Sequence, residues 1–236
     1  MRIKGRVHSV ETMGTADGPG LRIILFLQGC PLRCRYCHNP DTWNPRGGTA
    51  MTVSQSMKTI IKYKPYFSTT GGLTLSGGEP LTQAKYASQL FYQCKQHGIH
   101  TTLDTSGCML NPDVKRCLKY TDLVLLDVKH FEDKKYKWLT GSSLNHTLKI
   151  LDYLLENNIP VWIRHVIVPE FNDTIKDIRG YAALLKPYKR IIEKTELLPY
   201  HTMGVDKWKK LGIKYAFKNI KDLKPQKVNK LQQLLG

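Results

Sequence analysis

The sequence has few acidic residues and no long apolar run. Only 19 of its 236 residues are Asp or Glu, against 36 Lys or Arg, so the formal net charge is +17. Such an excess first suggests an acidic partner, with nucleic acid as the leading example. The most continuous apolar segment near the N-terminus, residues 23–27, has the length of a strand and is far too short to cross a bilayer. We find no signal-peptide pattern, so a cytoplasmic location is expected.

Internal repeats, low-complexity tracts and linker-like segments are also lacking. The hydrophobic fraction of 41% is ordinary for a folded protein, which excludes disorder as the main state. We therefore expect a single domain over residues 1–236, with a C-terminal helical segment from about residue 205 to 236.

Apolar runs of strand length alternate with helical patterns along the chain. The strands are expected at 21–28, 73–76, 99–104, 122–128, 160–168 and 190–198. The helices are expected near 53–64, 81–97, 110–119, 144–157, 173–186 and 225–235. This alternation indicates an α/β fold of parallel strands joined by right-handed crossovers. Six such units are too few for an eight-fold barrel, so a partial barrel or an open curved sheet is predicted, with chemistry at the carboxyl ends of the strands.

Half of the cysteines crowd into one short segment at residues 29–45. The three are Cys30, Cys34 and Cys37. The other three have no ligand spacing and are expected to be ordinary thiols: Cys94, Cys108 and Cys117. Three thiols on one loop suit either zinc, with His38 as fourth ligand, or an iron–sulfur cluster with one iron left open. The cluster is favoured, because no second Cys-x-x-Cys knuckle is present and His38 directly follows Cys37.

Seven segments carry a resemblance to a known family. They are GTADGPG at 14–20, FLQGCPLRCRYCHNPDTW at 26–43, SGGEP at 76–80, LDTSG at 103–107, LLDVKH at 125–130, VWIRHVIVP at 161–169 and LLPYH at 197–201. In this order they resemble the radical S-adenosylmethionine (radical SAM) enzymes, and among them the glycyl radical enzyme activases that act on pyruvate formate-lyase. The resemblance implies a partial (β/α)6 barrel, a 4Fe–4S cluster and S-adenosylmethionine. The implied reaction is reductive cleavage of this cofactor to a 5′-deoxyadenosyl radical, which abstracts hydrogen from a glycine of the partner.

The resemblance also implies roles for individual residues. The catalytic set would be Cys30, Cys34 and Cys37 as cluster ligands, with Lys129 and Asp17. The cofactor-binding set would be Tyr36, Cys37, His38, Asn39, Gly77, Gly78, Glu79, Asp104, Asp127, Val128, Lys129, Arg164 and His201. Within it, the backbone of the Gly-Gly-Glu segment would meet the methionyl amino group, and Lys129 would bind the carboxylate. The family can also hold a monovalent cation near Asp104, Thr105 and Asp127.

Plainer interpretations of the same residues stay open. Residues 77–79 could simply form a strand-to-helix turn with Pro80 at the first helical position. Asp104 and Asp127 could be helix N-caps. Tyr36 could be ordinary packing and Arg164 a structural ion pair, whereas Asp17 lies in a turn-rich segment and His201 alone is a weak candidate.

Residues 44–72 contain no cysteine, so the cysteine-rich insert of many related activases is lacking. This favours pyruvate formate-lyase as the partner. A monomeric enzyme is also expected. Lysines at 206–210 and 221–230, away from the strand-end motifs, could guide a flavodoxin or ferredoxin-type electron donor, or form a solvated surface. The alternatives are an activase of another glycyl radical enzyme, a radical enzyme that modifies RNA, and a zinc-dependent nucleic-acid-binding module. With the family resemblance, nucleic acid becomes the least supported partner.

Overall fold

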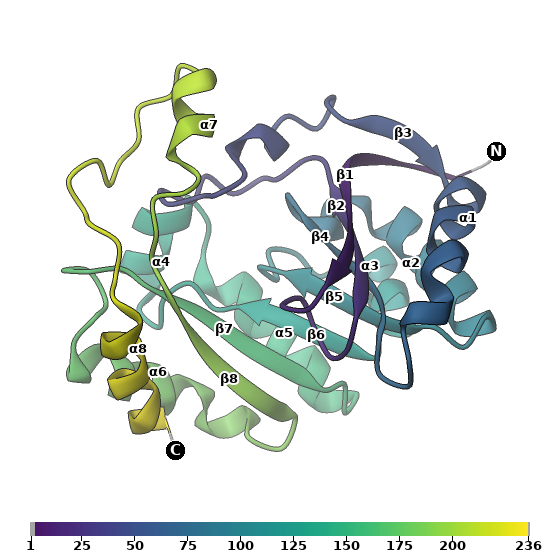
Figure 1. Ribbon diagram of the computed structural model, residues 1–236. Helices are drawn as coiled ribbons and strands as arrows, with labels where there is room; N and C mark the ends of the chain where they lie inside the picture. The colour runs from purple at the N-terminus through teal and green to yellow at the C-terminus, as the bar shows by residue number, and fades with distance from the viewer. Residues whose placement is uncertain (1–2, 236) are drawn as a thin grey trace. The chain divides into compact units, whose positions relative to one another are not determined.

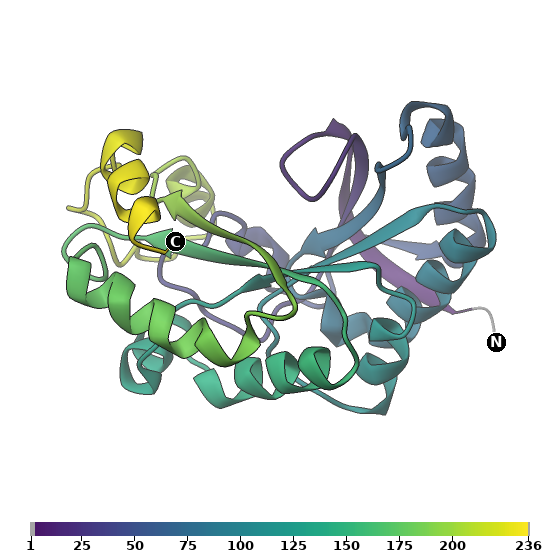
Figure 2. The same ribbon diagram turned by 90° about the horizontal axis from the view of Figure 1, so that it is seen from below.

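A computed structural model describes residues 3–235 (Figures 1 and 2). The chain divides into two units. Unit 1 comprises Met1–Pro31 and Thr42–Leu125, and unit 2 comprises Leu32–Asp41 and Leu126–Gly236. Strand β6 (Leu123–Asp127) begins in unit 1 and ends in unit 2.

Unit 1 contains a sheet with the strand order β3-β1-β2-β4-β5-β6. Its further strands are β1 (Lys4–Gly14), β2 (Arg22–Leu27), β3 (Thr49–Thr52), β4 (Gly72–Gly77) and β5 (His100–Thr105). Strands β2, β4 and β5 are parallel, whereas β1 runs antiparallel to both β2 and β3. Nearly every residue of β2 and β4 is buried, as expected of parallel strands covered on both faces.

Two of the helices described in unit 1 begin at recognisable caps. The helices are α1 (Val53–Tyr63), α2 (Ala84–Gln96), which follows the short 3-10 helix η3 (Pro80–Gln83), and α3 (Pro112–Leu118). Thr52 and Gln55 form a capping box at α1, and Asn111 caps α3, with Pro112 at its first position. These caps explain why α1 and α3 start where the sequence predicts them.

Unit 2 continues with the order β6-β7-β8. Strands β7 (Val161–Ile167) and β8 (Ile192–Pro199) are parallel, and Arg164 pairs with Glu196 in their register. The helices are α4 (Asp133–Thr140), α5 (Leu144–Glu156), α6 (Ile175–Leu185), α7 (Val205–Lys210) and α8 (Pro225–Gln232). Helix α8 contacts β8 through the side chain of Gln232. Its Oε1 accepts from Leu197 N and its Nε2 donates to Thr195 O, both at 2.8 Å.

All six predicted strands occur close to their predicted bounds, as do the six predicted helices, which confirms the α/β class with parallel strands. The prediction missed β1, β3 and α4, whereas α7 begins at residue 205, where the expected C-terminal helical segment starts. Within residues 3–235, no helix combines the length and apolar character needed to span a membrane. That the whole chain forms one domain stays a prediction.

Candidate functional site

The three clustered cysteines differ from the other three in their surroundings. Cys30, Cys34 and Cys37 are half-buried and form no disulfide. In unit 2, Cys37 N donates to Cys34 O at 3.1 Å, and Cys37 Sγ accepts from Asn39 N at 3.3 Å. The isolated cysteines are buried instead, and burial raises the pKa of Cys94 and of Cys117 to about 12. Those two thiols are protonated at neutral pH and cannot serve as thiolate ligands without a large energetic cost.

In unit 2, the cysteine loop runs along the last turn of α4. Arg33 N donates to Thr140 O at 2.8 Å and Arg35 N to Leu139 O at 2.9 Å. These bonds satisfy carbonyls that a helix end leaves without intrahelical partners. The Arg35 guanidinium carbon also lies 4.2 Å from the ring centroid of Trp138. The loop therefore has a fixed backbone path before any ligand binds.

Tyr36 is packed into the interior of unit 2. It is 4% exposed and belongs to an apolar cluster with Leu139, Val168, Tyr200 and Phe217. Burial raises the pKa of Tyr36, so its hydroxyl stays protonated. That hydroxyl has no hydrogen-bond partner among the described residues. The packing interpretation of Tyr36 therefore holds, and a buried donor is still left for a ligand.

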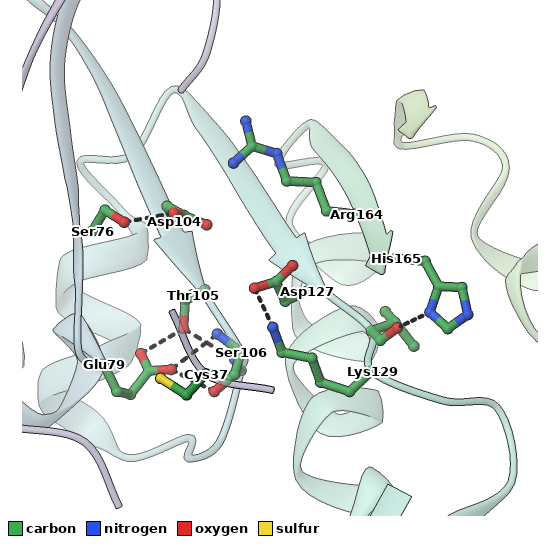
Figure 3. A network of polar contacts seen from close by, with 12 residues as sticks. Cys37, Ser76, Glu79, Asp104, Thr105, Ser106, Asp127, Lys129, Arg164 and His165 are labelled. Atoms are coloured by element: carbon green, nitrogen blue, oxygen red, sulfur yellow. Dashed lines mark hydrogen bonds and ion pairs between the residues drawn. The ribbon is translucent and has the colours of Figure 1, made fainter. Parts of the chain in front are cut away.

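Glu79, in unit 1, is 1% exposed, and its carboxylate is surrounded by neutral donors (Figure 3). Oε1 accepts from Leu81 N at 3.0 Å and Thr105 Oγ1 at 2.6 Å. Oε2 accepts from Ser106 N at 2.9 Å and from Ser106 Oγ. Four donors fill the acceptor capacity of a carboxylate. The side chain therefore ties the end of β4 to the end of β5.

Two glycines precede Glu79 because the backbone is crowded there. Gly77 has φ +110°, and a Cβ on it would lie 2.4 Å from Leu27 N. A Cβ on Gly78 would lie 2.4 Å from Gly29 O. Pro80 begins η3, so the strand-to-helix turn predicted as the plainer interpretation is present. The turn leaves no room for any residue larger than glycine at positions 77 and 78.

The helix-cap interpretation of Asp104 and Asp127 is wrong. Helix α3 is capped by Asn111, and the residue at the N-cap of α4 is Glu132. In unit 1, Asp104 Oδ2 accepts instead from Ser76 Oγ at 2.6 Å. In unit 2, Asp127 Oδ2 lies 2.5 Å from the Lys129 ammonium (Figure 3).

Lys129 is a nearly buried cation in unit 2. Its side chain is 12% exposed, and its Nζ lies 5.8 Å from the ring centroid of Tyr36. Burial acts to lower the pKa of Lys129, but the Asp127 charge, with smaller contributions from Tyr36 and Cys34, raises it well above the ordinary value. The ammonium has one hydrogen bond, to Asp127, among the described residues, so two N–H groups are available to an anionic ligand.

His38 and His201 lie against each other in unit 2. Their rings stack with centroids 4.0 Å apart, and His38 Nε2 donates to His201 O at 3.1 Å. Burial lowers the pKa of His38, so the ring is neutral at pH 7. His201 Nδ1 is buried and has no partner among the described residues. The sequence alone gave no reason to pair these two histidines.

Arg164, on β7, is 9% exposed, and its Nε lies 3.4 Å from Glu196 Oε2. The structural ion pair considered for Arg164 is therefore present. Its backbone oxygen accepts from Val128 N at 3.1 Å. Sequence reasoning missed His165, the next residue, whose Nδ1 donates to Val128 O at 2.7 Å (Figure 3). The Asn172 amide donates to His165 Nε2 at 3.0 Å, which leaves Nδ1 as the donor of this ring. Residues 164 and 165 of β7 therefore both bond the Val128 backbone, one at its N–H and the other at its carbonyl.

The turn that carries Asp17 is fixed by an arginine that sequence reasoning did not select. Arg22 is fully buried; its guanidinium donates to Pro19 O at 2.8 Å and to Thr74 Oγ1 at 2.6 Å. Thr74 Oγ1 in turn donates to Asp17 O at 2.7 Å. Burial lowers the pKa of Arg22 to about 10 against the opposing charge of Asp17, so it stays cationic at neutral pH. A charge at the start of an otherwise apolar strand was the available signal.

The donor set fits an iron–sulfur cluster better than a single zinc ion. The His38 ring, the fourth ligand of the zinc alternative, is engaged with His201. Three cysteines on one short segment suit a cluster in which each cysteine binds a different iron. The buried hydroxyl of Tyr36 and Nδ1 of His201 are polar groups that a bound cofactor could satisfy.

Comparisons with known proteins identify the family of this chain. Residues 24–182 match the radical SAM superfamily. The pyruvate formate-lyase-activating enzyme of Clostridium pasteurianum is 44% identical over 99% of this chain and 98% of its own, and that of Staphylococcus epidermidis is 48% identical over 92% and 90%.

Solved structures show the same fold. A domain of pyruvate-formate lyase-activating enzyme from Bacteroides vulgatus has a TM-score of 0.57 at 24% identity, covering 70% of this chain and 92% of that one. Streptococcus suis SuiB bound to S-adenosylmethionine has a TM-score of 0.63 at 17% identity, covering 87% and 44%. The predicted partial-barrel fold class is thereby confirmed. The chain belongs to the radical SAM superfamily and, within it, to the family of pyruvate formate-lyase-activating enzymes.

Proposed function

We propose that this chain activates pyruvate formate-lyase by generating a glycyl radical on it. The observation that carries the proposal is the 44% identity to a pyruvate formate-lyase-activating enzyme over 98% of that protein's length. Membership of the superfamily implies a 4Fe–4S cluster and S-adenosylmethionine. When bound, the reduced cluster supplies the electron that cleaves the cofactor to methionine and the 5′-deoxyadenosyl radical, which takes a hydrogen atom from the target glycine.

The proposed cluster ligands are Cys30, Cys34 and Cys37. Their half-buried position supports this role, because the thiols must lose their protons to bind iron. The backbone N–H of Asn39 donates to Cys37 Sγ, and this hydrogen bond would stabilise the thiolate form of Cys37. The aromatic packing around Tyr36 would keep water away from this side of the loop.

In unit 1, we assign the backbone of Gly77, Gly78 and Glu79 to the methionyl amino group of the cofactor. Because four donors already saturate the Glu79 carboxylate, that side chain would hold the backbone in place and not contact the cofactor itself. Asp104 is assigned to the same cofactor from the family pattern.

In unit 2, Lys129 is the proposed partner of the cofactor carboxylate, since a nearly buried ammonium with two available N–H groups suits such an anion. The further proposed contacts rest on the family pattern: His38 and Asn39 beside the adenine, and Asp127, Val128, Arg164 and His201 around the methionine part. A monovalent cation held by Asp104, Thr105 and Asp127 has the same basis.

On the substrate side, the turn with Asp17 is proposed to meet the glycine segment of the partner. The hydrogen bonds from Arg22 to Pro19 O and from Thr74 to Asp17 O support this role. A turn whose backbone is already fixed loses less conformational entropy when it binds a partner. A flavodoxin or ferredoxin-type protein is the proposed electron donor. A monomeric state and a cytoplasmic location complete the proposal.

Electron paramagnetic resonance tests this function. The chain is purified anaerobically, loaded with iron and sulfide, photoreduced, and mixed with S-adenosylmethionine and pyruvate formate-lyase. We expect an organic radical signal on the partner, lost in Cys37→Ser and retained in Cys117→Ser, which changes a buried thiol outside the loop. A brown, reducible protein that leaves pyruvate formate-lyase radical-free would refute the proposal. A colourless protein that takes up zinc and no iron would refute the cluster as well.

A further inference from the structure

Helix α7 contacts the segment that follows Cys37. The sequence predicts that the lysines of residues 206–210 lie away from the strand-end motifs, but in the structure Lys207 contacts Asn39 and Asp41 of the cysteine loop. Trp208 is 4% exposed, and its indole Nε1 donates to Cys37 O at 2.8 Å. The backbone of a proposed cluster ligand is therefore bonded to the C-terminal part of unit 2.

Lys207 makes the second connection. Its Nζ donates to Asn39 Oδ1 at 2.9 Å and lies 3.0 Å from Asp41 Oδ2. Asn39 is the residue whose backbone N–H donates to Cys37 Sγ at 3.3 Å. Lys207 thus holds the side chain of the residue whose backbone contacts the sulfur, and its charge lies beside the carboxylate of Asp41, four residues beyond Cys37.

Packing on both sides holds α7 in this position. Just before it, a Cβ on Gly204 would lie 2.7 Å from His38 Cα, so the two backbones are in close contact. The Trp208 ring lies edge-on to Tyr215, with centroids 5.2 Å apart, and the Tyr215 hydroxyl is 2.8 Å from that of Tyr200. Lys209 and Lys210, by contrast, are exposed. The helix therefore has one face on the cysteine loop and one face in solvent.

We propose that α7 is a clasp on the Cys37 end of the cysteine loop, and that Trp208 and Lys207 are positioning residues for the cluster. The clasp sets how tightly a cluster bound through Cys37 is retained and how readily it is reduced. Hydrogen bonds to cluster sulfurs and nearby charges shift the reduction potential, and groups behind the ligands affect metal affinity. Without the Lys207 charge, the negative charge of Asp41 would be less compensated, which would oppose the added electron and make the potential more negative.

The experiment measures cluster retention and potential, not activity. The chain is loaded anaerobically with iron and sulfide, and the loss of cluster absorbance in excess EDTA gives a rate. A dye titration gives the midpoint potential. The variants are Trp208→Phe, which keeps a ring but removes the N–H, and Lys207→Met, which keeps the stem but removes the charge. Lys210→Met is the matched control, because it removes one charge from the exposed face of the same helix.

We expect both clasp variants to lose the cluster about tenfold faster than the unmodified chain. Lys207→Met should also lower the midpoint potential, Lys207→Arg should restore it, and Lys210→Met should match the unmodified chain. Unaltered rates and potentials in Lys207→Met, or equal effects in Lys210→Met, would overturn the inference. If Trp208→Phe fails to fold, the two Lys207 variants still test whether α7 affects the retention and the potential of the cluster.

The role proposed for α7 rests on cluster binding, which the proposed function also requires. An unmodified chain that takes up no iron overturns both. A chain whose cluster responds to Lys207→Met but which forms no radical on pyruvate formate-lyase overturns the proposed function alone.

Discussion

Glu79 in unit 1 and Lys129 in unit 2 are both nearly buried ionic groups at the ends of strands, but they are partnered in opposite ways. Glu79 accepts four hydrogen bonds, all from backbone amides and hydroxyls. Lys129 makes one, to the carboxylate of Asp127. The first group has no binding capacity left, whereas the second has two donors to spare.

This difference separates a group that holds the protein together from one suited to hold a ligand. A saturated buried carboxylate fixes its surroundings, and removing its charge leaves several donors facing one another. A cation with a single partner is already charged and positioned, so an anion can bind without rearrangement of the site. Burial alone would not distinguish them; the number of unused hydrogen bonds does.

The largest expected effect comes from breaking the Glu79 group. Glu79→Gln places an amide donor against the donors from Thr105 and Ser106, so we expect the free energy of unfolding to fall by about 3 kcal/mol. Urea denaturation of the metal-free chain measures this. Glu11→Gln, on an exposed position of β1, is the matched control and should change stability by less than about 0.5 kcal/mol. Equal midpoints for the two variants would show that the Glu79 network contributes little.

Lys129→Met tests the other group. We expect the affinity for S-adenosylmethionine to fall roughly thirtyfold, about 2 kcal/mol, because a hydrogen bond from a charged donor to the cofactor carboxylate is lost. Equilibrium dialysis of the cluster-loaded chain under argon gives the dissociation constant. Lys135→Met on α4, whose side chain is 37% exposed, should bind the cofactor normally. Unchanged binding in Lys129→Met would assign the carboxylate to another cation.

A smaller effect, a decrease in the free energy of unfolding, should appear on acidification. Burial lowers the pKa of His165 to about 4, with His130 and Lys129 adding to the effect and the Val128 carbonyl and Asp127 opposing it. The unfolded chain takes up a proton near pH 6.5 and the folded chain does not, so stability is lost as pH falls below about 6.5. Between pH 7 and 5.5 we expect His165 to account for a loss of about 1 kcal/mol, and His130, whose pKa burial also lowers to about 4, to add to it.

Hydrogen exchange, corrected for the intrinsic effect of pH, can locate that loss. Amides of β7 in unit 2 should lose protection between pH 7 and 5.5, while those of β4 in unit 1 should change less. Equal losses in both strands would mean that acid acts on the whole chain and not through His165.

Much of the fold could be predicted because the parallel strands are apolar on both faces. Strands such as β2 and β4 appear in the sequence as continuous apolar runs. Strand β1 was missed because most of its side chains from Ser9 to Met13 are exposed, and β3 because it is short and has no buried residue. The missed α4, DKKYKWLT, has too few apolar positions to show a helical period.

The site was less predictable than the fold wherever a contact joins distant segments. The cysteine spacing and the Gly-Gly-Glu turn are local, so the sequence showed them. The bond from Trp208 to Cys37 spans 171 positions, and the one from Lys207 to Asn39 spans 168. No local pattern reports such contacts, and a tryptophan among lysines resembles an ordinary charged surface. The four donors on Glu79 were missed because Thr105 and Ser106 have no distinctive spacing from it.

The sequence distance between Trp208 and Cys37 also has a consequence for biosynthesis. At about 5 to 20 residues per second, a ribosome needs roughly 10 to 30 seconds to extend the chain by the 171 positions from Cys37 to Trp208. During that interval the nascent chain carries its cysteine motif without the α7 contacts. The bond to Trp208 can form only after residue 208 has been made, so it follows synthesis of the cysteine motif by that interval.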